Sequence, residues 1–475
     1  MGCLATEERA VLYNSVEFLA LFAATLLGAG WLKGSARRRL LLIASLIFYG
    51  SWSPAYLLLL LSLILGNYLL GKQAHKNPGG PWLIPLACSF NLGLLAWFKY
   101  ARFISDNITP ALHSLGIQSE GFGHGIVLPL AISFITFQGL AYVIDVSRGE
   151  APAKNLEAFA LFLSFFPQLI AGPIVRAREL LPQLERQREA DSSELRSGLH
   201  LVALGFLKKC LIADHLGLFV DATWGQGAAD TGAANLVAAY AYTFQIYFDF
   251  SGYTDIGRGI ARMLGIHLPE NFNRPYLALG IRDFWRRWHM SLSRWLRDYL
   301  FIAMGGSRGS TVKTYRNLML TMILGGLWHG AAWGFVLWGL LHGLALAIER
   351  WIHEQPTWVA RLGRWNEHLS YRLLLRFFTF HLVLVGWILF RLVDGEQCLK
   401  ALWLIVSFAG GWPGALMPTV FMIIIIALIY FLLTPLRDGL LNRRLPSPTL
   451  LLVGLVIGLS VGFGPLQNPF IYFQF

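Results

Sequence analysis

Long apolar stretches separated by short polar segments recur along the whole chain. A helix needs roughly 20 such residues to cross about 30 Å of hydrocarbon, and most of the stretches reach that length. They lie near residues 12–32, 40–70, 82–98, 125–144, 317–348, 372–393, 416–435 and 448–465. Runs such as Leu57–Leu65 do not alternate with period two, as a membrane β-strand would. The pattern predicts an all-α integral membrane protein of about ten or more helices, some shorter than a full span.

Composition agrees with this prediction. Of the 475 residues, 55% are hydrophobic and only 14% are charged, and the mean hydropathy is +0.53. A soluble domain of this composition would expose large apolar patches, whereas the lipid bilayer accepts helices that are apolar on every side. A soluble protein is therefore excluded.

The positive charge follows the topology expected of a multi-pass membrane protein. A formal net charge of +12 is also typical of proteins that bind nucleic acid. Here, however, the basic residues form short clusters between the apolar stretches, as in the cytoplasmic loops of membrane proteins. The clusters are Lys33–Arg39, Lys72–Lys76, Arg148–Arg196, Lys208 with Lys209, Arg258–Arg316 and Arg437–Arg444. We assign them to the cytoplasmic side, place both chain ends outside, and expect no nucleic-acid partner.

Two apolar segments are poorly shaped for crossing a bilayer. Phe159–Val175 contains two prolines and a glycine, and Leu199–Val220 has two adjacent lysines near its centre. Re-entrant or interfacial helices fit both segments, and broken backbone at membrane depth is stable only inside protein or along a watery cavity. An internal chamber and ordinary packing against neighbouring helices explain these features equally well. Between them, the polar stretch Arg176–Arg196 predicts a surface helix or loop.

Arginine and tryptophan alternate irregularly between Arg282 and Asp298. Placed on a helix, these residues form a basic face beside an aromatic one, which suits the membrane–water interface. Interfacial anchoring is one interpretation of each residue. The other is that Arg286, Arg287 and Arg294 bind an anionic substrate such as the phosphates of coenzyme A, which guanidinium groups bind well.

His329 is an ionisable residue inside an apolar run, with Leu318–Leu327 before it and Ala331–Leu341 after it. Such a residue is a functional candidate, and a histidine that titrates near neutral pH suits removal of a hydroxyl proton during acyl transfer. The alternative is a neutral histidine that is hydrogen-bonded to a neighbouring helix. His342 favours a structural role, and His289 lies at the edge of the arginine and tryptophan block, facing either water or the chamber.

Neither metal chemistry nor a division into domains is indicated. The four cysteines are widely separated and have no Cys or His neighbours at metal-ligand spacing: Cys3, Cys88, Cys210 and Cys398. The chain also lacks a flexible linker and a visible internal repeat. We therefore expect one membrane domain without a metal site.

Several strings of residues, taken in order, are more specific than any single histidine. They are LYNSVEFLALF at 12–22, FFPQLIAGPIVR at 165–176, YFDFSGYTDIGRGIARMLGI at 247–266, NFNRPY at 271–276, the WRRWHMSLSRWLRDY block, GGLWHGA at 325–331 and the terminal NPFIYFQF. Together they resemble the membrane-bound O-acyltransferase family, and in particular its alginate O-acetyltransferase branch. The resemblance covers residues 12–475 as a single domain and leaves residues 1–11 as an N-terminal extension.

The resemblance implies a fold and a site. The fold is a ring of helices with re-entrant segments around a central cavity, which a cytoplasmic funnel and an outward tunnel reach. His329 matches the catalytic histidine of the family, and His289 matches its second signature position. His329 then acts either as a general base or as a transient acyl carrier.

The resemblance also implies a reaction and a location. Acetyl-CoA is the donor, and the acetyl group crosses the bacterial inner membrane to periplasmic acetyltransferase partners. These partners place it on an exported polysaccharide, with alginate and cellulose as the candidate polymers.

Two alternatives remain open. One keeps the family but changes the acceptor, for instance to teichoic acid or a lipid. The other is a non-enzymatic transporter, which also has polar residues in broken helices but predicts inverted repeats.

Overall fold

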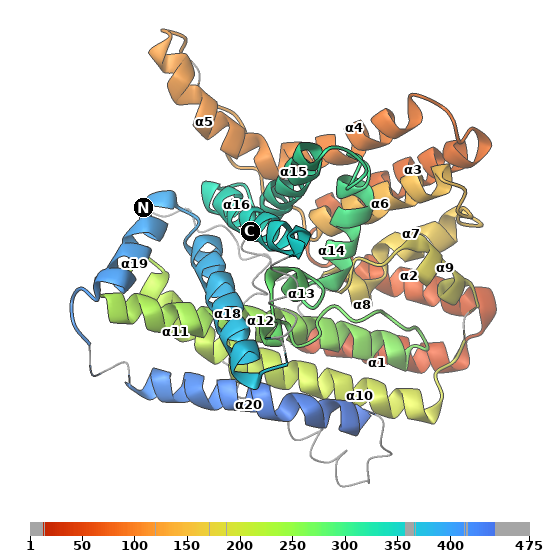
Figure 1. The fold of residues 1–475 in the computed structure, drawn as a ribbon. Coiled ribbons are helices and arrows are strands. Elements are labelled where there is room, and N and C mark those ends of the chain that lie inside the picture. The colour runs from red at the N-terminus through yellow and green to blue at the C-terminus, as the bar shows by residue number, and fades with distance from the viewer. Residues whose placement is uncertain are drawn as a thin grey trace. The chain divides into compact units, whose positions relative to one another are not determined.

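The described part of the chain is helical throughout. The computed structural model describes residues 13, 15–118, 120–170, 172–186, 188–356, 365, 367–412, 414 and 417–441. Helices are the regular secondary structure of these residues, among which no strand occurs (Figure 1). The prediction of an all-helical protein is confirmed. The predicted extension 1–11 and the predicted apolar stretch 448–465 lie outside the described residues.

The described residues form two compact units. The first contains the residues up to Phe206 together with Tyr253–Pro269. The second contains Leu207–Gly252 and the described residues from Glu270 onward. Each unit has its own core and is considered by itself.

The first unit contains the N-terminal helices and the last turns of the long helix α12. Its helices are α1 (Val16–Trp31), α2 (Gly34–Gly50), α3 (Pro54–Lys76), α4 (Leu83–Leu95), the π-helix η1 (Ala96–Tyr100), α5 (Ala101–Ser114), α6 (Ile132–Ser147), α7 (Leu156–Ser164), α8 (Phe166–Leu169), α9 (Ala177–Arg186), α10 (Ser192–Phe206) and the end of α12 (Gly232–Met263).

The second unit contains most of α12 and the helices that carry both predicted histidines. Its other elements are the π-helix η2 (Leu207–Ala213), α11 (Asp214–Trp224), the 3₁₀-helix η3 (Pro275–Leu277), α13 (Ile281–Trp285), α14 (Met290–Trp295), the π-helix η4 (Leu296–Phe301), α15 (Thr311–His329), α16 (Trp333–Glu354), α18 (Leu369–Leu392), α19 (Gly395–Ser407) and α20 (Met417–Leu441).

Local sequence signals start and break these helices. The side-chain oxygen of Ser310 accepts a hydrogen bond from the backbone nitrogen of Lys313 at 3.3 Å, which caps α15. Two apolar stretches each contain two helices. Stretch 40–70 breaks before Pro54, because proline fits the first turn of a helix but not its interior. Stretch 317–348 breaks at residues 330–332, directly after His329.

Both segments that were predicted to be poorly shaped are irregular. After α7, the first segment forms the single short turn α8, and residues 172–176 are not helical. The second segment passes from α10 through the π-helix η2 into α11. A break in the backbone is confirmed for the first segment, whereas the second is an uninterrupted helical run with a π-helical section. The re-entrant path of both segments stays a prediction. The polar stretch between them forms α9, whose Leu180, Leu181 and Leu184 are buried. On the same helix Arg178, Pro182 and Arg186 are exposed, so the predicted surface helix is confirmed.

Buried polar pairs join the helices of the first unit. The hydroxyl of Tyr13 donates to the carbonyl oxygens of Phe166 and Pro167 at 3.0 and 3.1 Å, which satisfies backbone acceptors of the broken α8 segment. Asn67 on α3 and Asn91 on α4 exchange two side-chain hydrogen bonds of 3.0 and 2.8 Å. Such pairs hold apolar helices together because an unpaired buried polar group is costly.

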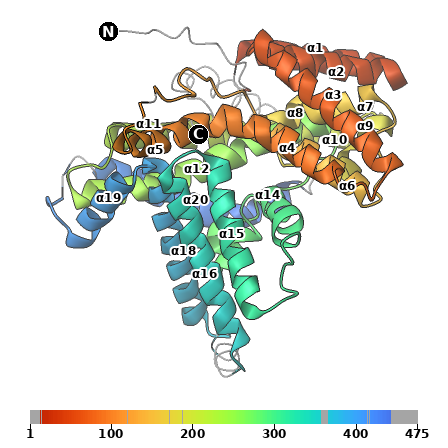
Figure 2. The same cartoon turned by 90° about the horizontal axis from the view of Figure 1, so that it is seen from above.

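The second unit is built around α15, α16 and α18, which lie side by side (Figure 2). Glycines permit the close contact between α15 and α16. A Cβ atom on Gly326 would clash with the carbonyl oxygen of Phe335, and one on Gly339 would clash with that of Met322. Backbones that approach this closely are typical of helix pairs in membranes.

Within the described residues, four helical segments are long and apolar enough to cross a membrane. They are Pro54–Lys76, Leu83–Ser114, Trp333–Glu354 and Leu369–Leu392. Shorter apolar helices include Val16–Trp31 and Ile132–Ser147. The membrane character of the chain is thereby confirmed, and the assignment of its loops to the two sides of the membrane stays a prediction.

Candidate functional site

The arginine and tryptophan block does not form one continuous helix. α13 ends at Trp285, and α14 begins only at Met290 before it passes into η4. His289 occupies the break with a left-handed backbone, φ 41°, which is strained for a residue that has a side chain. The continuous helix expected for this block is therefore wrong, and the break places His289 in a fixed turn.

Asn271 holds this turn in place. Its side-chain Oδ1 accepts hydrogen bonds from the backbone nitrogen of Ser291 at 3.0 Å and from the Ser291 hydroxyl at 2.9 Å. The same oxygen lies 3.3 Å from Nδ1 of His289. The carbonyl oxygen of Asn271 also accepts from the backbone nitrogen of Met290 at 3.0 Å. One buried asparagine thus fixes the start of α14 and the orientation of the imidazole.

The tryptophans of the block are buried inside the protein. Trp285, Trp288 and Trp295 are 9%, 1% and 8% exposed. Trp288 packs on the rings of Phe272 and Trp387, with centroids 5.0 and 4.8 Å apart. Interfacial anchoring by these three tryptophans is therefore wrong, because their rings are buried inside the protein instead of facing lipid headgroups.

His329 is the last residue of α15 and is 3% exposed. Its imidazole meets the rings of Trp328, Trp338 and Phe390 edge-on, with centroids 4.9, 5.2 and 5.1 Å away. The next residue is a glycine, Gly330, where a Cβ atom would clash with a neighbouring aromatic ring. The local sequence thus places the imidazole at a helix end among aromatic rings, where the helical backbone gives way to an extended chain.

Trp328 joins the two predicted histidines. Its ring lies 6.1 Å from that of His289 and 4.9 Å from that of His329, measured between centroids. His289 is fully buried and also touches the ring of Phe250 at 4.8 Å. Burial lowers the pKa of His289 to about 3, so this imidazole is neutral near pH 7. The structure therefore brings both histidines into one buried aromatic cluster.

His342 belongs to the same cluster. It is fully buried, and its ring lies 4.7 Å from that of Trp338, which also contacts His329. Neither ring nitrogen of His342 has a hydrogen-bond partner among the residues that the structure describes. Its structural role stays a prediction.

The three predicted arginines have different surroundings. Arg286 is exposed and lines a cavity of about 750 Å³ between the α13 segment, α16 and α18. Arg287 donates from Nε to Oδ1 of Asp283 at 2.8 Å, and Arg294 lies partly buried on α14. Glu349 lines the Arg286 cavity as well, so the cavity is not uniformly positive. Of the three guanidinium groups, that of Arg286 has the surroundings that best suit an anionic ligand.

A buried ionic cluster lies at the π-helix η2 and was not predicted. Nζ of Lys209 lies 2.7 Å from Oδ1 of Asp214 and 2.6 Å from Oδ1 of Asp249. The three side chains are 2%, 4% and 3% exposed. Asp249 directly precedes Phe250, the residue that touches His289. The sequence signal was present as charges inside apolar segments, but their pairing depends on the fold.

Neither metal nor serine-hydrolase chemistry finds support here. In the described part of the chain, no group of three or more His, Cys, Asp or Glu residues has the geometry of a metal site. The GxSxG pattern of serine hydrolases occurs at residues 305–309 and 458–462, and the second match lies outside the described residues. In the first, Ser307 is exposed and accepts a hydrogen bond from Arg350 at 3.1 Å. It follows a π-helix, whereas a nucleophile elbow follows a strand.

Comparison with known proteins shows the family of the chain. Residues 154–365 match the model of the membrane-bound O-acyltransferase family, and both histidines lie in that range. The chain is 43% identical to a probable alginate O-acetylase of Pseudomonas aeruginosa over 390 residues, which cover 80% of this chain and 72% of the relative.

Two further relatives have names that give other acceptors. A peptidoglycan O-acetyltransferase of Helicobacter pylori is 37% identical, over 76% of this chain and 72% of the relative. A teichoic acid D-alanyltransferase of Bacillus subtilis is 31% identical, over 56% of this chain and 69% of the relative. With its helical membrane fold and these relatives, the chain belongs to the membrane-bound O-acyltransferase family and is an O-acyltransferase.

Proposed function

We propose that this O-acyltransferase takes an acetyl group from cytoplasmic acetyl-CoA and passes it across the bacterial inner membrane for O-acetylation of an exported polysaccharide. The observation that carries the proposal is the 43% identity to a probable alginate O-acetylase over 80% of the chain. The relative named a peptidoglycan O-acetyltransferase supports acetyl as the transferred group and a carbohydrate as its acceptor. An alginate-type or cellulose-type polymer is the expected final acceptor.

His329 is the proposed catalytic residue. As a general base, its imidazole takes the proton of the acceptor hydroxyl while the hydroxyl oxygen attacks the thioester carbonyl carbon. The carbon–sulfur bond then breaks, and the coenzyme A thiolate leaves and is protonated. As an acyl carrier, its ring nitrogen attacks the same carbon first, and the acyl-imidazole passes the acetyl group to the hydroxyl. The aromatic rings around His329 exclude water, which protects the thioester from hydrolysis.

His289 and Asn271 support this chemistry. Since the imidazole of His289 is neutral, it presents one ring N–H and one acceptor nitrogen instead of a positive charge. Its fixed turn and its contact with Trp328, which also contacts His329, support a role for His289 in orienting a reacting group. Asn271 acts through His289 and is a positioning residue.

Arg286 is the proposed contact for the donor. Acetyl-CoA carries several phosphates, and an exposed guanidinium at the wall of a cavity of about 750 Å³ suits one of them. Arg287 and Arg294 are expected to add positive potential nearby. Periplasmic acetyltransferase proteins are the proposed partners that receive the acetyl group and modify the polymer.

The test is the O-acetyl content of the exported polymer in a deletion strain. The strain is complemented with wild type, His329→Ala or the control variant His75→Ala, whose histidine is exposed on α3 and does not line the Arg286 cavity. Membrane levels of all three proteins are compared by immunoblot. We expect acetylation with wild type and His75→Ala, and none with His329→Ala at equal protein level.

Other outcomes overturn separate parts of the proposal. Normal acetylation with His329→Ala would show that this histidine is structural. Loss of D-alanine from teichoic acid in the deletion strain, with unchanged polysaccharide acetylation, would favour the alanyl-transfer function named for the Bacillus subtilis relative. Membrane vesicles supplied with acetyl-CoA that carries a radiolabelled acetyl group test the donor independently of the acceptor. The label enters the membrane fraction only if acetyl-CoA is the donor.

A further inference from the structure

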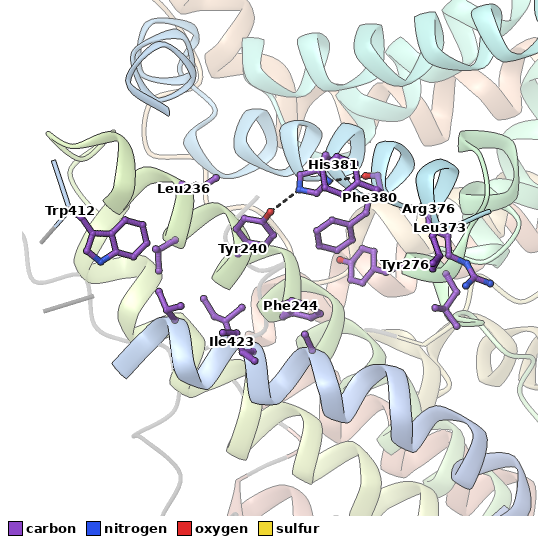
Figure 3. A pocket seen from close by; sticks show the side chains of 16 residues that line it. Leu236, Tyr240, Phe244, Tyr276, Leu373, Arg376, Phe380, His381, Trp412 and Ile423 are labelled. Carbon is purple, nitrogen blue, oxygen red and sulfur yellow. Dashed lines mark hydrogen bonds between the residues drawn. The ribbon is translucent and has the colours of Figure 1, made fainter. Parts of the chain in front are cut away.

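A second cavity, of about 580 Å³, lies between α12, α18 and α20 in the second unit (Figure 3). Its volume is within the range of small-molecule sites. The wall is almost entirely hydrocarbon, with Leu236 and Phe244 from α12, Phe380 from α18 and Ile423 from α20. Neither predicted histidine lines it. The cavity is therefore separate from the acyl-transfer site.

His381 lines this cavity, and both of its ring nitrogens already have hydrogen-bond partners. Nδ1 of His381 donates to the carbonyl oxygen of Phe377 at 2.8 Å, so in the neutral ring Nε2 is the acceptor. Nε2 then accepts from the hydroxyl of Tyr240 at 2.7 Å, which Figure 3 shows as a dashed line. Because both ring nitrogens of His381 are hydrogen-bonded within the protein, neither is left to bind a ligand. The space beside this histidine therefore suits an apolar ligand.

One end of the cavity is positively charged. Arg376 lines this end, and Trp412 lies at the other (Figure 3). Nε of Arg376 is buried and has no hydrogen-bond partner among the described residues. No Asp or Glu occurs among the described residues that line the cavity. A buried guanidinium nitrogen without a partner is costly, so an anionic oxygen at this position would stabilise it.

The mouth of the cavity opens on a surface suited to lipid. Leu373, Phe377 and Ile424 line it and are 52%, 56% and 51% exposed. The first two belong to α18, one of the helices that are long and apolar enough to span a membrane. Bilayer lipids therefore have lateral access to the cavity. Arg376 lies in the first third of α18, near one end of the span, where lipid phosphates are found.

We propose that this cavity binds an anionic phospholipid, with the phosphate on Arg376 and an acyl chain extending past Phe380 towards Trp412. The chemistry of the wall distinguishes this ligand from acetyl-CoA. Coenzyme A brings several phosphates, an adenine and a polar arm, whereas the cavity offers one guanidinium and a long apolar wall. A phospholipid matches both features at once.

The test uses full-length protein in nanodiscs of phosphatidylcholine that contain a few per cent of a photo-cross-linking lipid. The probe carries a diazirine in its acyl chain and has either a phosphatidylglycerol or a phosphatidylcholine headgroup. Irradiated protein is digested, and the labelled peptides are identified by mass spectrometry. We expect the phosphatidylglycerol probe to label α12, α18 and α20 at residues that line the cavity.

Matched variants distinguish the effect of the Arg376 charge on lipid binding from the effect of the shape of the cavity. Arg376→Gln should lower phosphatidylglycerol labelling of these peptides about tenfold, because it removes a charge-assisted hydrogen bond. Arg376→Lys should keep most of it, and Arg372→Gln, an exposed arginine one turn earlier, should leave it unchanged. Ala427→Phe fills the cavity and should abolish labelling by both probes, whereas Ala24→Phe, at an exposed position on α1, should not.

Three results overturn the proposal. The first is labelling of the cavity peptides that does not depend on Arg376 or on the headgroup. The second is labelling confined to other helices in wild type. The third is a photo-cross-linking residue at Ile423 that attaches to the chain after Leu441, which would show that the protein fills its own cavity. Size-exclusion profiles and melting curves that match wild type confirm that the variants fold.

Discussion

Asn271 and Ser291 are joined by two hydrogen bonds to a single oxygen, at 3.0 and 2.9 Å. Replacing Asn271 with Ala leaves both buried donors without their acceptor, at a cost of about 1–3 kcal/mol, and frees the imidazole of His289 to reorient. We expect the turnover number to fall about tenfold or more, with little change in the KM for acetyl-CoA, because the donor site is untouched. Ser293→Ala is the control, since Ser293 lies on the same helix but bonds the carbonyl of Trp288 instead. A rise in KM without loss of turnover would contradict the assigned role.

The adjacent glycines Gly325 and Gly326 should respond differently to alanine. At Gly326 a Cβ atom meets the backbone carbonyl of Phe335, which cannot move without separating α15 from α16. We expect Gly326→Ala to lower the free energy of unfolding by about 1–3 kcal/mol. At Gly325 the nearest atom is the end of the Leu296 side chain at 3.0 Å, which can rotate, so the change should be within about 1 kcal/mol. Melting temperatures in detergent compare the two, and equal losses would contradict close packing at Gly326.

Lys209→Met should be strongly destabilising. It removes the cation that contacts both Asp214 and Asp249, and it leaves two carboxylates buried. Breaking such a cluster costs about 3–5 kcal/mol. Denaturant unfolding measures the loss, and a triple variant that also carries Asp214→Asn and Asp249→Asn should recover part of it.

The control for this cluster is Lys400→Met. That lysine is 45% exposed and pairs with Asp230, which is 97% exposed, at 3.5 Å. We expect a change of no more than about 0.5 kcal/mol. Similar losses in Lys209→Met and Lys400→Met would show that the buried cluster contributes little.

Arg286→Gln should weaken binding of the donor without slowing the chemical step. Because Arg286 lines the cavity of about 750 Å³, its loss should raise the KM for acetyl-CoA about tenfold at constant turnover number. Arg282→Gln is the matched control, since its side chain is exposed and does not line that cavity. An unchanged KM in Arg286→Gln would place the donor phosphates elsewhere.

His289 should not shape the pH profile between pH 5 and 8. Burial lowers its pKa to about 3, so the protonated form appears only well below this window and the neutral form prevails throughout it. We therefore expect His289→Asn to lower the rate at every pH while leaving the midpoints of the profile unchanged. A shifted acid midpoint in this variant, measured in reconstituted vesicles, would show that His289 titrates near neutral pH.

The helical fold was predictable because it depends on local signals. Apolar length, Pro54 and the serine before α15 act within a few residues, and they set where several helices begin. α12 escaped prediction as a single helix, since Asp249 and other buried polar residues interrupt its apolar pattern. Those residues are stable only because partners such as Lys209 reach them from another element.

The candidate site residues could be named from the sequence, but their geometry could not be predicted from it. The apolar surroundings of His329 marked it as unusual, and the structure agrees with that placement. Nothing local reveals that His289 breaks the arginine and tryptophan block, because the break is held by Asn271 from a distant part of the sequence. The burial of the tryptophans likewise depends on neighbours such as Trp387 that only the fold brings near.

The π-helix η2 constrains the length of the chain between α10 and α11, in addition to the identity of its side chains. A π-turn holds one residue more than an α-turn, and each residue of an α-helix advances the chain by about 100° around the axis. Deleting one residue from Leu207–Ala213 would relax the turn to α geometry and swing Lys209 away from Asp249. Evolution can therefore exchange side chains here more readily than it can shorten or lengthen the segment.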